Sequence, residues 1–295
     1  MPNANAGAAS LGKSQLRFGP RGVWVFPPLL LLFILFFYPL SLIVTQSFRG
    51  DDRIFSFVYY QSVLLSAQFA SALLHTVVIA VVASAGCLLL GLTLALILTF
   101  IAFPGAGTLA RLIDCVIALP TFLVALAFAF IYGSAGILNI SLMHGLGLKL
   151  PPVDFLYSPW GVILAEITVY TPFVLRPLLA AFSLIETAQI EIASSLGAGP
   201  WRIMRQIILP AALPALLAGG SLCLLLTVTE FGIVLFIGAK GVTTLPLMIY
   251  DKAIQEFDYS TACVIAVINV TLSLGLYSLY RTMLAHFGGR SAGLV

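Results

Sequence analysis

Six long apolar segments, separated by short polar stretches, constrain the fold of this chain more than any other feature. A helix that crosses a bilayer needs about 20 mostly apolar residues, and every segment reaches that length. The segments are 24–45, 72–101, 112–132, 160–184, 214–236 and 259–284. Only 8% of the residues are charged, against roughly 25% in soluble domains. We therefore predict an all-α polytopic membrane protein with six transmembrane helices and no separate soluble domain.

The Lys and Arg residues between these segments predict the orientation of the chain, because cytoplasmic loops carry an excess of them. One side holds eight of them, the other five. The side with the excess contains the arm 1–22, the loop after the second segment, the loop after the fourth segment, and the tail 286–295. We therefore expect both termini in the cytoplasm, on either side of a permease domain at 23–285.

The loop at 186–213 has more internal pattern than a simple connection needs. Its central part, EIASSLGAGPWRIMRQIILP at 191–210, contains two glycines that allow a sharp turn between two short helices. Trp201, Ile203, Met204 and Ile207 then follow at helical spacing on one face. We expect that apolar face to be buried, either in the groove of a partner protein or in the membrane surface.

A nucleotide site in this chain is excluded by context, although residues 7–14 read GAASLGKS. This phosphate-binding pattern requires a strand before it and a helix after it, and only six residues precede it here. We therefore expect no cofactor in this chain and no enzymatic site; ATP would be bound by a partner subunit. The three histidines are scattered, with no catalytic set around them.

The spacing in the loop resembles the cytoplasmic motif of permease subunits of binding-protein-dependent ABC importers. That motif reads Glu-Ala-Ala, three residues, Gly, nine residues and Ile-x-Leu-Pro. The matching residues here are Glu191, Ala193, Gly197, Ile207, Leu209 and Pro210, with Ile192 in place of the second motif residue. The resemblance implies a coupling helix that docks into a cleft of a cytoplasmic ATP-binding subunit, with Trp201 and Met204 on the apolar face.

Four further stretches, at 36–44, 117–136, 150–158 and 219–246, look like the permease of 2-aminoethylphosphonate importers. This resemblance implies a small polar solute, an external binding protein that delivers it, and a second permease subunit, identical or different. The loop motif also fits importers of polyamines, iron(III), sulfate or thiamine. A secondary transporter or a membrane scaffold without an ATPase remains the alternative outside this class.

Ionisable residues inside the apolar segments are costly in a bilayer, so their default interpretation is functional. Glu166, Arg176 and Glu230 form a candidate pathway: at 1.5 Å rise per residue the two carboxylates share a depth, and Arg176 lies about 15 Å further along. Acids outside and a guanidinium deeper would suit a zwitterion with an ammonium and a phosphonate. Mutual pairing between helices is an equally open interpretation, and for Asp114 we expect pairing with Arg111 or Arg176.

Overall fold

The structure, a computed structural model, describes residues 25–49 and 55–288, and every regular element in those ranges is a helix. The arm 1–22 with its GKS match, and residues 289–295 of the predicted tail, lie outside the described residues. Six helical stretches are long and apolar enough to cross a membrane, which confirms the predicted number. They are Phe26–Ser47, Ala67–Phe100, Thr121–Leu146, Pro159–Phe182, Pro200–Val228 and Tyr259–Thr282.

The described residues up to Thr45 form one compact unit, and those from Gln46 onward form a second. The first unit contains α1 (Phe26–Leu32), the π-helical turn η2 (Phe33–Phe37) and most of α2 (Tyr38–Ser47). The π-turn ends two residues before Pro39, whose ring lacks an N–H and would clash with the carbonyl four residues earlier in a regular α-helix. The large apolar side chains of this unit are exposed, as suits a helix surrounded by lipid or by other helices.

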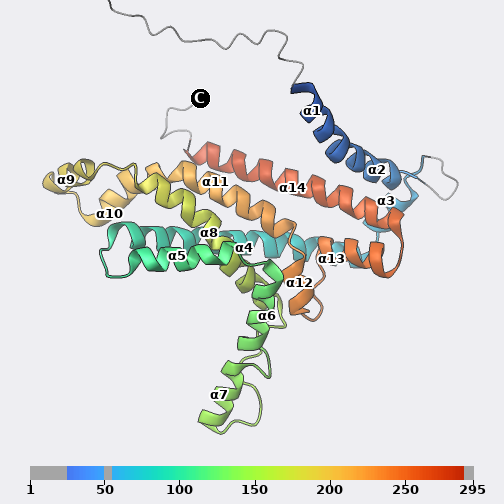
Figure 1. Ribbon diagram of the computed structural model, residues 1–295, viewed down its shortest axis with the longest axis horizontal. Helices are drawn as coiled ribbons and strands as arrows, with labels where there is room; N and C mark the ends of the chain where they lie inside the picture. The colour runs from blue at the N-terminus through green and yellow to red at the C-terminus, as the bar shows by residue number, and fades with distance from the viewer. Residues whose placement is uncertain (1–24, 50–54, 289–295) are drawn as a thin grey trace, which may run out of the picture. The chain divides into compact units, whose positions relative to one another are not determined.

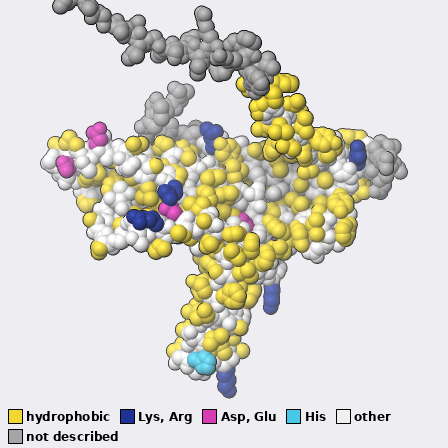
Figure 2. Space-filling view, viewed as in Figure 1, with side chains coloured by type: hydrophobic (Ala, Val, Ile, Leu, Met, Phe, Trp, Pro, Cys, Tyr) yellow, Lys and Arg dark blue, Asp and Glu magenta, His cyan; other side chains and the backbone are white. Residues whose placement is uncertain are grey.

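The second unit holds the remaining helices (Figure 1). They are α3 (Val58–Leu64), α4 (Ala67–Phe100), α5 (Ala106–Ile117), α6 (Thr121–Tyr132), α7 (Ile137–Leu146), α8 (Pro159–Phe182), α9 (Thr187–Ser195), α10 (Pro200–Ile203), η3 (Met204–Ile208), α11 (Leu209–Val228), α12 (Gly232–Ile237), α13 (Leu245–Tyr250), η4 (Asp251–Gln255) and α14 (Tyr259–Gly288). Hydrophobic side chains cover much of the visible face of this unit, and charged ones are few (Figure 2).

The core of the second unit is the contact of α8 with α4 and α11. Gly91 of α4 and Gly219 of α11 both face Val174 of α8: a Cβ atom built on either glycine would lie 2.9 Å from Val174. Small residues let helix backbones approach closely in membrane proteins, where apolar burial alone does not drive association. The helix α14 packs on α11 and α13, whereas α6 packs on α12 and α8 and, with α7, projects away from the long helices (Figure 1).

Two of the predicted segments are not continuous helices, which corrects their boundaries. The segment at 112–132 is interrupted at 118–120, because Pro120 lacks an N–H and disfavours a helical conformation in the residue before it. Pro120 therefore marks the start of α6. The segment at 214–236 is interrupted at 229–231. Pro172 and Pro177, by contrast, lie inside α8.

Candidate functional site

The glycine-containing turn of the 186–213 loop ends α9 with a Schellman motif. Gly197 has a positive φ of +81°, its N–H donates to Ser194 O at 3.0 Å, and Ala198 N–H donates to Ala193 O at 3.0 Å. A left-handed residue at this position favours glycine because a Cβ atom would be strained there. The chain then restarts as α10, with Gly199 at the N-cap and Pro200 in the first turn.

Three large apolar side chains at this turn are exposed. Ile192 of α9, Leu196 of the turn and Trp201 of α10 are 60%, 81% and 76% exposed, and Glu191 is exposed beside them. Leu196 was missed in the sequence because it lies between the motif positions. We call Ile192, Leu196 and Trp201 the apolar turn surface. An apolar surface of this kind marks a site of interaction with protein or membrane.

The other residues of the apolar face expected from the sequence are less exposed than Trp201. Ile203 and Met204 are half-buried against the core of their own chain, so only Trp201 of the original stripe is free to meet a partner. The helix does not stop at Pro210 but passes through η3 into α11. As at Pro39, a π-helical turn that ends two residues before the proline accommodates its missing N–H and its bulky ring. Ile207 and Pro210 are half-buried and Leu209 is 40% exposed.

The two helix interruptions meet at one cavity of about 300 Å³, whose lining is mostly apolar but includes the carboxylate of Glu230. Leu119 borders it from the first interruption, Thr121 from the start of α6, Thr229 and Glu230 from the second interruption, and Tyr170 from α8. The rings of Phe122 and Phe236, with centroids 5.3 Å apart, hold α6 against α12 beside it. Discontinuous helices in membrane proteins are tolerated where they border a cavity, and they commonly form solute sites.

Glu230 is 7% exposed and is held by two donors. Ile233 N–H donates to Oε1 at 2.8 Å, which caps the start of α12, and the Tyr170 hydroxyl donates to Oε2. Gly232 is needed beside it, since a Cβ atom there would lie 2.9 Å from Thr121 Oγ1 and 3.3 Å from Glu230 Oε1. The interruption therefore fixes the carboxylate on the cavity wall.

The other two charges of the predicted pathway lie elsewhere. Glu166 is 1% exposed, and neither of its carboxylate oxygens has a hydrogen-bond partner in the described structure. It does not border the cavity but stands one helical turn before Tyr170 on α8. Arg176 forms a two-point ion pair with Asp114 of α5, one of the two pairings expected from the sequence, and its side chain is 58% exposed. The structure thus brings Glu230 alone of the three to the cavity.

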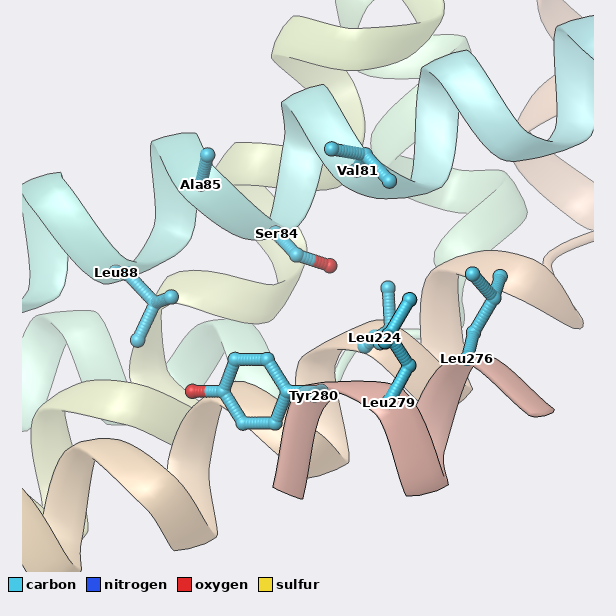
Figure 3. A pocket seen from close by; sticks show the side chains of 8 residues that line it. All are labelled: Val81, Ser84, Ala85, Leu88, Leu224, Leu276, Leu279 and Tyr280. Atoms are coloured by element: carbon cyan, nitrogen blue, oxygen red, sulfur yellow. The ribbon is translucent and has the colours of Figure 1, made fainter. Parts of the chain in front are cut away.

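A second cavity, of about 240 Å³, lies between α4, α11 and α14 and is almost wholly apolar (Figure 3). Its two polar side chains are already satisfied: Ser84 shares a hydrogen bond with Thr227 at 3.3 Å, and the Tyr280 hydroxyl donates to Leu216 O at 2.8 Å. It offers no group to a charged solute. The cavity at the helix interruptions is therefore the better candidate for a polar solute.

Comparison with known proteins decides the class. Residues 87–290 match the family described as binding-protein-dependent transport system inner membrane component. The chain belongs to this family. It is a multi-pass inner-membrane permease of a binding-protein-dependent transport system.

Individual members of the family cover nearly the whole chain. Over 281 residues, 95% of this chain and 98% of the relative, it is 60% identical to PhnU of Salmonella typhimurium strain LT2, a permease provisionally assigned to 2-aminoethylphosphonate transport. It is 32% identical over 268 residues (90% and 92%) to the sulfate transport system permease CysT of Escherichia coli K12. The fold matches a chain of a bacterial alginate ABC transporter crystallised with an alginate-bound periplasmic protein. That match has a TM-score of 0.78 at 18% identity and covers 91% of this chain and 95% of the other.

Proposed function

We propose that this chain is the membrane-spanning permease of an ATP-driven importer for 2-aminoethylphosphonate. The observation that carries the proposal is the 60% identity to PhnU over almost the full length of both chains. The sulfate permease CysT shares about half that identity, so a phosphonate cargo is the better supported of the two. The chain itself would move the solute and leave ATP hydrolysis to a separate subunit.

The apolar turn surface is the proposed contact with that ATPase subunit. The Lys and Arg excess supports a cytoplasmic position for this loop and for both termini. In water, exposed Ile192, Leu196 and Trp201 are stabilised by entering a partner's groove, and all three lie at or beside the glycine turn. Force from the ATPase would then pass through α10 and η3 directly into α11, because these helices are continuous.

The solute pathway is proposed to use Glu230, Arg176 and Glu166 in different ways. Glu230 borders the cavity directly. Arg176 has an exposed guanidinium whose carboxylate partner could be exchanged for a phosphonate, which Arg binds in the same two-point geometry. Glu166 lies in the core one helical turn before Tyr170 and would act on the pathway only through α8. A second permease subunit, identical or different, would close the open side, and an external binding protein would deliver the solute.

Uptake in cells tests the cargo. We expect cells that produce the complete transporter to accumulate radiolabelled 2-aminoethylphosphonate, and cells lacking only this chain to lose that uptake. Excess unlabelled 2-aminoethylphosphonate should suppress the signal, whereas sulfate and putrescine should leave it unchanged. If sulfate or putrescine suppresses uptake as strongly as the unlabelled phosphonate, the proposed cargo is wrong.

A further inference from the structure

Glu230 is a buried carboxylate without a cationic partner in the described part of the chain. The ion pairs there are Arg176 with Asp114 and Lys252 with Glu256, and neither includes Glu230. Its two donors, the Tyr170 hydroxyl and the Ile233 N–H, are both uncharged groups. A buried charge is costly unless it is paired, so this site favours a positive group supplied from outside.

The geometry leaves room for that group. A carboxylate offers about four lone-pair positions, and the two donors occupy one on each oxygen. The cavity in front of Glu230 has a volume of about 300 Å³, at the lower end of the range for small-molecule sites. A compact solute of a few heavy atoms therefore fits it.

The remaining lining suits an ammonium group. Tyr170 and Phe173 of α8 both border the cavity, with ring centroids 6.3 Å apart, and aromatic faces attract organic cations. The other walls, formed by Val169 and Leu226 among others, are apolar, and apolar surroundings strengthen a charge-assisted hydrogen bond. No Lys or Arg borders this cavity in the described structure, so it carries no charge that would repel a cation.

We propose that the cavity at the two helix interruptions is a selectivity site for the ammonium end of the solute. Glu230 binds the ammonium directly, and Tyr170 is a positioning residue that holds the carboxylate toward the cavity. This inference rests on the proposed function, since it assigns one end of 2-aminoethylphosphonate to one place in the permease. Solutes that lack an amine would then bind this site poorly even when their phosphonate is identical.

Phosphorus NMR on the purified permease–ATPase complex, without binding protein or nucleotide, tests the site. The probes are 2-aminoethylphosphonate and ethylphosphonate, which differ in the amine. The complex is titrated into each probe, and the broadening of the phosphorus line reports binding. We expect the wild-type complex to broaden the line of 2-aminoethylphosphonate at a concentration of complex at least about tenfold lower than the concentration needed for ethylphosphonate. Glu230→Gln should abolish this preference, and Glu230→Asp should restore part of it.

A matched control is Asp154→Asn, which also removes one carboxylate but at an exposed position outside the cavity, and which should keep the wild-type preference. Tyr170→Phe should weaken the preference by about threefold while the complex stays assembled. That outcome distinguishes a positioning role from a purely structural one. If Tyr170 were only structural, the substitution would change assembly and leave the ratio of the two probes' affinities unchanged.

Three outcomes would overturn the inference: an unchanged preference in Glu230→Gln, equal binding of the two probes by wild type, or binding of neither. If Glu230→Gln does not assemble, competition in the wild-type complex decides. Propylammonium should then displace 2-aminoethylphosphonate and propylphosphonate should not, and the reverse order would contradict the site. A wild-type transporter that accumulates no 2-aminoethylphosphonate refutes the proposed function instead, so the two failures are distinguishable.

Discussion

Single glycines set how closely the core helices approach, and Gly219 gives the sharpest test at this scale. A Cβ atom on Gly219 would lie 2.9 Å from Val174 Cα and 3.1 Å from Phe173 O, which are backbone atoms that cannot rotate away. We predict that Gly219→Ala destabilises the permease by about 1–3 kcal/mol, measured as a lower melting temperature in detergent. The control is Gly145→Ala in α7, where a Cβ atom would meet nothing within 4 Å. There the change should be neutral or slightly stabilising, and an equal loss at both positions would contradict close packing at Gly219.

Asp251 provides a prediction about pH outside the membrane-spanning helices. Partial burial raises the pKa of its carboxyl, the nearby Glu256 raises it further, and Lys252 opposes the shift. A raised pKa means that folding favours the protonated acid, so stability falls as pH rises above the ordinary carboxyl pKa of about 3.9. Asp251→Asn should therefore be slightly more stable than wild type at pH 7, with a slightly higher melting temperature. The gain in free energy of unfolding should be about 0.5 kcal/mol or less, because this side chain is largely solvated. The difference should vanish near pH 4; a variant that is less stable at pH 7 contradicts this sign.

At the residue scale, the sequence predicts how far along a helix a side chain lies but not which side of the helix it faces. Glu166 and Glu230 were placed at one depth from the rise per residue, yet Glu166 is in the core and Glu230 is on a cavity wall. The hydrophobic pattern could not separate them, because both surroundings are apolar in sequence. Arg176 and Asp114 are 62 residues apart, and their pairing depends on how α5 packs against α8.

At the scale of helices, prolines account for some of the positions at which helices begin or change their hydrogen-bond pattern. Pro120 starts α6, and Pro39 and Pro210 each follow a π-helical turn, but only the first changes a predicted boundary. The interruption at 229–231 has no proline. The sequence signals for this interruption are weaker. The Thr229 hydroxyl donates a hydrogen bond to Leu225 O at 2.9 Å, and the Glu230 carboxylate takes the place of a backbone acceptor for Ile233 N–H. Polar residues just before a glycine within an apolar run therefore indicated this break, but not specifically enough to predict it.

The turn between α9 and α10 yields a prediction at the same scale. Proline requires a φ near −65°, whereas Gly197 has +81° and donates its N–H to Ser194 O. We predict that Gly197→Pro disrupts the apolar turn surface while the chain still inserts into the membrane. The amount of solute taken up per ATP hydrolysed should fall at least about tenfold. Gly199→Ala is the control, since its φ of −71° suits alanine and a Cβ atom there meets nothing within 4 Å. Coupled uptake at the wild-type level in Gly197→Pro would contradict the proposed role of the turn.

At the scale of the whole molecule, the sequence was sufficient for the class of protein and insufficient for its mechanism. Six apolar spans and the loop motif predicted a permease of a binding-protein-dependent importer, which the family match confirms. The domain boundaries, the cytoplasmic termini and the subunit partners remain predictions, because they depend on the membrane and on chains outside this one. The convergence of two helix interruptions on one cavity is a property of the packed structure and is absent from any single segment.

Reconstitution into liposomes tests the central claim most directly. The permease, its ATPase subunit and the external binding protein would be combined, and uptake of labelled 2-aminoethylphosphonate measured with and without ATP. We predict uptake that requires ATP, the binding protein and this chain together. Uptake that persists without ATP or without the binding protein, or that does not occur when all components are present, would contradict the account.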